Sequence, residues 1–130
     1  MIMELNINKR IAVIDFETTG FDPYKDEVTE VAVVMIDGIN GNEIGAFSSL
    51  VKIKANDIPT EVQKITGITK KDTEKGLSFD VVKGVVTELL DGVIVVAHNL
   101  PFEAEWLKVQ FDIDIPLFYD TLTIDRMNYP

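Results

Sequence analysis

The pattern of apolar and polar positions predicts strands in the first half of the chain. Apolar-rich stretches that are typical of strands occupy residues 11–16, 28–36 and 45–53. They are separated by a loop at 20–25 and by a segment at 37–42 that is rich in glycine and asparagine, residues that favour tight turns. We therefore expect the three strands to pair as an antiparallel meander.

Helical spacing takes over after residue 60. Apolar residues three and four positions apart predict a helix that starts after Ser78 as N-cap and stops at Gly92; these residues are Phe79, Val82, Val86, Leu89 and Leu90. Two possible capping boxes, Thr60-Glu-Val-Gln63 and Thr69-Lys-Lys-Asp72, indicate two further helix starts.

The last part of the chain returns to a strand. The unbroken apolar run at 93–97 predicts a central strand covered on both faces. Asn99 as a cap and Pro101 in the first turn then predict a helix. A strand near 117–119 and a short helix from Thr121 complete the chain. The order of the elements indicates an α/β fold, with a mixed sheet of a three-strand antiparallel meander plus parallel strands, flanked by helices.

Composition narrows the possible classes of protein. The chain has 130 residues, 46% of them hydrophobic, as expected for one domain over 1–130. It has no Cys, which excludes disulfides and thiolate metal sites and is consistent with a cytoplasmic protein. No apolar run approaches the roughly 18 residues of a membrane span. The net charge of −10 argues against general affinity for nucleic acid, so such a substrate must be held locally, by metal ions or by a partner.

The first predicted strand ends in two carboxylates. Alternate side chains of a strand share a face, so Asp15 and Glu17 should emerge together. Carboxylate oxygens are ligands that Mg²⁺ prefers, and the following Thr18-Thr19-Gly20 would let the backbone approach a substrate closely. A plain solvated strand end is the alternative interpretation of the pair.

The segment Asp15-Phe-Glu17-Thr-Thr-Gly20 resembles the first motif of the DEDD 3′–5′ exonucleases. In particular, it resembles the proofreading type similar to the epsilon subunit of bacterial DNA polymerase III. Three further stretches match this family in order, so the resemblance covers nearly the whole chain; they are Glu30-Val-Ala-Val, Ile58 to Thr69 and Val96 to Glu103.

The resemblance implies an RNase H-like fold and a two-metal mechanism. Asp15, Glu17 and Glu103 would be the catalytic residues and the ligands of two Mg²⁺ or Mn²⁺ ions, which activate water and stabilise the leaving 3′ oxygen. The substrate would be the 3′ end of single-stranded DNA or RNA. Five further residues would contact it: Thr18, Ile65, His98, Asn99 and Phe102.

Three positions depart from the family pattern. The family normally has Asp at position 103, and the extra methylene of Glu103 displaces the carboxylate by about 1.5 Å. Thr66 replaces a His of many relatives. The third motif, a His base and a final Asp on a C-terminal helix, is not matched, because Asp120 and Asp125 lie in the stretch that precedes it.

These departures leave two functions open. One is a 3′–5′ exonuclease that hydrolyses terminal phosphodiesters, although the missing base argues against activity of the chain alone, since such a base contributes roughly 10²–10⁴-fold. The alternative is a weak or inactive module that docks on a partner protein. A partner or a second copy of the chain would then cover the sheet face that lacks the C-terminal helix. A haloacid-dehalogenase type of phosphatase is disfavoured, because it needs Asp at the position of Glu17.

Overall fold

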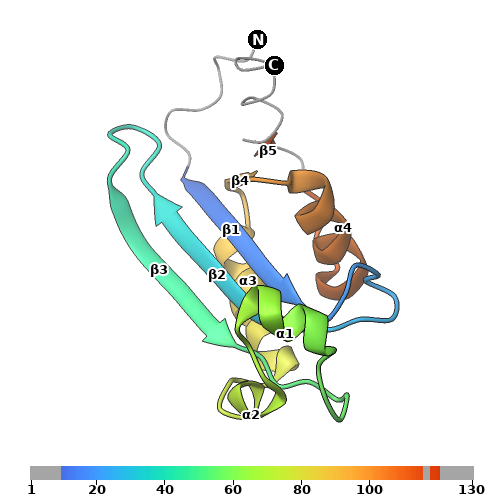
Figure 1. The fold of residues 1–130 in the computed structure, drawn as a ribbon. Helices are drawn as coiled ribbons and strands as arrows, with labels where there is room; N and C mark the ends of the chain where they lie inside the picture. Colours follow the sequence, from blue (N-terminus) through green and yellow to red (C-terminus); the bar gives the residue numbers. More distant parts are fainter. Residues whose placement is uncertain (1–9, 116–117, 121–130) are drawn as a thin grey trace.

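The computed structural model describes residues 10–115 and 118–120, which form a five-stranded mixed sheet in the order β3-β2-β1-β4-β5 (Figure 1). The first three strands form the predicted antiparallel meander, while β4 pairs parallel to β1 and β5 parallel to β4. Their bounds are Ile11–Thr18 (β1), Val28–Ile36 (β2), Glu43–Leu50 (β3), Ile94–Ala97 (β4) and Phe118–Asp120 (β5). The mixed sheet expected from the sequence is confirmed.

Several strand boundaries differ from the prediction, most of all those of β3, which begins at Glu43 rather than at residue 45, and of β1. The strand predicted at 45–53 ends at Leu50, because Val51 forms an isolated bridge with Leu77 and the apolar residues beyond it turn into a separate small core. That core consists of Ile53, Ile58 and Ile68. β1 continues two residues past the predicted end at residue 16, so that Glu17 still pairs with β2 before the register shifts at Thr18.

In the described part of the chain, four helices connect and cover the strands, with bounds Thr60–Thr66 (α1), Lys70–Thr73 (α2), Phe79–Leu90 (α3) and Leu100–Phe111 (α4). The predicted caps of α2 and α3 are confirmed: Thr69 and Asp72 form a capping box, and the Ser78 hydroxyl accepts a hydrogen bond from the backbone N–H of Val81. The helix predicted from Thr121 lies outside the described residues.

The predicted capping box at Thr60 is wrong. Pro59 occupies the N-cap of α1 and offers no capping side chain. Gln63 instead donates from its amide to the backbone oxygen of Ile58 at 2.7 Å, so its side chain is held by the entering chain rather than by Thr60. Asn99 does occupy the N-cap of α4, with proline in the first turn, but its side chain makes no capping hydrogen bond.

The main core lies between one face of the sheet and helices α3 and α4. Phe16 of β1 stacks on Phe111 of α4 with ring centroids 5.3 Å apart, and Phe79 of α3 contacts the same ring at 5.1 Å. Figure 1 shows α3 behind the strands, with α1 in front of them. Because side chains alternate along β1, Asp15 and Glu17 lie on the face opposite to Phe16.

Within the described ranges, no helix has both the length and the apolar character that crossing a membrane requires.

Candidate active site

Asp15 and Glu17 lie on one face of the sheet, as the sequence predicts, and a third acid joins them. The antiparallel register places Glu30 of β2 directly opposite Glu17, while Asp15 lies opposite Ala32. Side chains that face each other across such a pair have Cβ atoms about 4.5–5.5 Å apart. Asp15 is exposed, and Glu17 and Glu30 are half-buried. Glu30 therefore lies beside Glu17 near the end of β1.

The electrostatics of this group favour a bound cation. Burial raises the pKa of the Glu17 carboxyl above its ordinary value, and the negative charges of Asp15 and Glu30 raise it further. Desolvation and repulsion therefore both oppose the ionised form of the Glu17 carboxylate. A positive ion among these side chains would remove that cost.

The described side chains fit a metal ion that is completed by its substrate. Within residues 10–115 and β5, no three Asp, Glu or His side chains are close enough to hold a metal by themselves. Mg²⁺, however, commonly binds through one or two carboxylates and takes its remaining ligands from water and substrate phosphates. Asp15 and Glu17 provide such a pair.

Glu103 lies in the first turn of α4 and is 5% exposed. Its neighbours on the same helical face, Leu107 and Phe111, belong to the core, so the side chain points inward. The start of a helix favours a carboxylate, because the macrodipole is positive there. The role of Glu103 as a third metal ligand stays a prediction.

A pocket of about 280 Å³ opens beside Glu17. It is built by the end of β1, the loop that follows, α1 and the start of α4. Four of the five residues predicted to contact substrate line it, namely Thr18, Ile65, Asn99 and Phe102; the other lining residues are Phe16, Glu17, Gly20, Phe21, Val62 and Thr66. His98, the fifth, is exposed just after β4 and lies outside this lining.

The rim of the pocket is apolar and open to solvent. Phe21 is 89% exposed and Ile65 is 84% exposed. Large apolar side chains in such a position often mark a binding surface. Sequence reasoning missed Phe21 and Glu30: an aromatic residue after a glycine in a loop was the only signal for the first, and the second depends on strand register.

The loop between β1 and β2 is held in place by hydrogen bonds within the loop and from α4. The Thr19 backbone N–H donates to the oxygen of Glu27 at 2.8 Å, and the Glu27 N–H donates to the Thr19 hydroxyl at 2.9 Å. The Gln110 amide of α4 donates to the backbone oxygens of Pro23 and Asp26, both at 2.8 Å. A Cβ at Gly20 would collide with the Asp26 carboxylate. These contacts fix the loop in place, so that it forms one wall of the pocket.

Gln110→Leu should loosen that wall. The substitution leaves two backbone oxygens without their donor, which should lower the free energy of unfolding by about 1–2 kcal/mol. Urea denaturation measures the loss, and hydrogen exchange should quicken at residues 20–26. Lys108→Leu, on an exposed position of the same helix, is the matched control. Equal exchange in both variants would show that Gln110 does not hold the loop.

Comparison with known proteins places these features in a family context. The family model described as exonuclease (RNase_T) matches residues 12–130. The chain is 33% identical over 128 residues to the 3′-5′ exonuclease DinG of Bacillus subtilis, covering 94% of this chain and 13% of that protein. It is 36% identical over 115 residues to the PolC-type DNA polymerase III of Thermotoga maritima, covering 88% of this chain and 8% of that protein.

The fold has a counterpart among solved structures. Escherichia coli Exonuclease I in complex with a dA16 oligonucleotide superimposes with a TM-score of 0.81 at 19% identity, over 93% of this chain and 29% of that one. This likeness supports the RNase H-like arrangement of the sheet and helices. The chain thus spans about a tenth of the two curated relatives named above, at 13% and 8% of their lengths.

Proposed function

The chain belongs to the exonuclease family whose model matches residues 12–130, and on that premise we propose that it hydrolyses single-stranded DNA from the 3′ end. The observation that carries the proposal is the pair Asp15 and Glu17 on one sheet face, next to a pocket with an apolar rim. The relatives named 3′-5′ exonuclease and the neighbour solved with an oligonucleotide support this choice of reaction and substrate.

The family depends on divalent metal ions, and we take Mg²⁺ or Mn²⁺ as the ion here. Asp15 and Glu17 would hold it, and Glu103 would add a ligand from α4. A divalent cation supplies charge stabilisation of the scissile phosphate and lowers the pKa of the attacking water. The repulsion that raises the pKa of Glu17 supports a cation at this point.

The pocket would receive the terminal nucleotide. Phe102, Ile65 and Phe21 offer apolar surface to its sugar or base, and Thr18 and Asn99 offer polar atoms. The Thr18 hydroxyl already donates to the oxygen of Gly20 at 2.6 Å, so it would act toward substrate as an acceptor. His98 would contact the strand just outside the pocket.

A binding module without catalysis is the second candidate. It is favoured by one observation: the described residues bring no three metal-ligating side chains together. In that case the acids and the pocket would serve recognition, and a protein partner or a second copy of the chain would bind the sheet face that carries them.

The direct test uses an oligothymidylate of 20 nucleotides that is labelled at its 5′ end and incubated with the protein and Mn²⁺. We expect a ladder of labelled products that shortens from the 3′ end, because the pocket would take up the terminal nucleotide. A phosphorothioate linkage at the 3′ terminus should slow the cleavage. An RNA of the same length shows whether the protein prefers deoxyribose or ribose. Absence of products at high protein concentration would leave the binding module as the function.

A further inference from the structure

We propose that a second pocket binds phosphate groups of the nucleic-acid strand, several nucleotides away from its 3′ end. The pocket lies across the β1–β2 loop from the candidate active site. The identity of the ligand as a strand rests on the proposed function, whereas the affinity for phosphate rests on the pocket itself.

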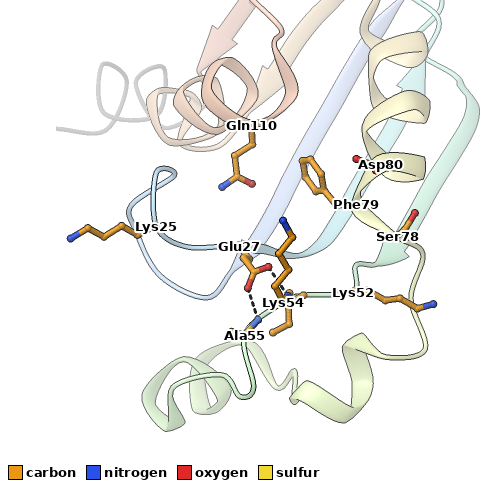
Figure 2. A pocket seen from close by; sticks show the side chains of 10 residues that line it. Lys25, Glu27, Lys52, Lys54, Ala55, Ser78, Phe79, Asp80 and Gln110 are labelled. Atoms are coloured by element: carbon orange, nitrogen blue, oxygen red, sulfur yellow. Dashed lines mark hydrogen bonds between the residues drawn. The ribbon is translucent and has the colours of Figure 1, made fainter.

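The pocket has a volume of about 850 Å³ and is formed by segments far apart in the chain. These are the end of the β1–β2 loop, the segment after β3, the start of α3 and the last turn of α4. Figure 2 shows the Lys54 side chain directed between Glu27 and Phe79 toward Gln110, with Lys25 and Lys52 at the edges and directed outward. One ammonium group thus faces the hollow and two flank it.

The charge of this region differs from that of the rest of the protein. Between Lys52 and Lys75 the chain has six lysines and four acidic residues, a net charge of +2 within a total of −10. The remaining residues therefore carry a net charge of −12. A polyanion that approaches this acidic protein would find its favourable surface here.

The lysines of the pocket are available to a ligand. The Glu27 carboxylate accepts hydrogen bonds from the backbone N–H groups of Lys54 and Ala55 at 2.7 and 3.0 Å, so backbone donors already engage it. Among the described residues, the one ion pair within 4.0 Å joins Lys83 and Asp112, outside this pocket. Asp80 is the remaining acid in the lining, so the lysines outnumber the acids by three to two.

The position of the pocket favours a nucleic-acid strand over an acidic peptide. One loop separates the two pockets and lines both, with Gly20 and Phe21 on the side of the active site and Lys25 on the other. Helix α4 also contributes to both, through Phe102 at its start and Gln110 at its end. A strand whose last nucleotide enters the first pocket can cross the loop and place earlier phosphates near Lys54.

The test compares Lys52→Gln/Lys54→Gln with the wild type by fluorescence anisotropy, in EDTA to prevent cutting. For a labelled 20-residue oligothymidylate, we expect about fivefold weaker binding at low salt, and a slope of log K against log salt that is smaller by about 1.4, as two lost phosphate contacts predict. A thymidine dinucleotide should compete with the labelled oligonucleotide equally well in the double variant and in the wild type. Lys83→Gln, which removes one positive charge at a lysine outside the pocket that is already paired, is the control and should behave like the wild type.

Three results would overturn the inference. The first is equal binding of the oligonucleotide by the double variant and by Lys83→Gln, and the second is no binding by the wild type at 50 mM salt. In the third, the double variant loses affinity for polyglutamate while keeping its affinity for the oligonucleotide, which would assign the pocket to an acidic peptide.

The proposed function is judged separately by the cleavage assay. A wild type that cleaves the oligonucleotide, with a double variant that binds it normally, refutes the second pocket alone. A wild type that never cuts, with a double variant that binds more weakly, refutes the proposed function alone.

Discussion

Glu17→Gln should lower kcat/KM for oligonucleotide cleavage by about 10²–10³-fold, the usual cost of removing a group that stabilises charge in a transition state. Glu17 borders the pocket for the terminal nucleotide and shares its sheet face with Asp15, so its loss removes half of the carboxylate pair that would hold the cation. Asp15→Asn should have an effect of the same order. Initial rates with Mn²⁺ measure both.

Glu17→Gln should also stabilise the folded protein when no metal is present. The pKa of Glu17 is raised in the fold, so its ionised form is disfavoured by burial and by the charges of Asp15 and Glu30. At pH 7, Glu17→Gln removes that cost, and the thermal midpoint in EDTA should rise. In the wild type, the free energy of unfolding should fall as the pH increases above the ordinary value of 4.5, because the folded state then loses a proton that it binds more tightly than the unfolded state.

With metal present, the wild type should become more stable than Glu17→Gln. A ligand that binds only the folded state at 100 times its dissociation constant adds about 2.7 kcal/mol, and only the wild type should gain this from Mg²⁺ or Mn²⁺. Glu43→Gln, at an exposed position of the edge strand β3, is the matched control for the change in charge. Equal stabilisation of the wild type and Glu17→Gln by metal would remove Glu17 from the metal site.

Glu103→Asp should raise activity by about tenfold. Shortening the side chain draws the carboxylate back by about 1.5 Å, to the length that the family pattern has at this position, and misplacement by about 1 Å can cost as much as 10²-fold in rate. Glu103→Gln keeps the size of the buried side chain and removes its charge, so metal affinity should fall. Calorimetric titration with Mn²⁺, alongside kinetics, measures both effects.

The two variants at position 103 separate a ligand from a structural carboxylate. If Glu103 only fills the interior at the start of α4, Glu103→Gln should bind metal like the wild type, and Glu103→Asp should change the thermal midpoint without changing the rate. Unchanged metal affinity in both variants would exclude this residue from the metal site.

Local patterns predicted much of the fold. The capping side chains of Thr69 and Ser78 act within three residues of themselves, and the structure confirms both. Thr60 shows the limit of such patterns: the same spacing of residues fails where Pro59 enters the helix and Gln63 has a nearer acceptor in Ile58. A motif identifies possible hydrogen bonds, and the geometry of the entering chain selects among them.

The sequence by itself determined that Asp15 and Glu17 share a face, because side chains of a strand alternate with a period of two whatever surrounds them. Only the tertiary structure decided that Glu30 faces Glu17, that Phe21 borders the pocket beside Glu17 and that the Lys54 side chain points into another pocket. The residues that meet at these places lie mostly far apart along the chain. They meet through strand register and helix packing, which are set by burial of the whole core rather than by any spacing of residues.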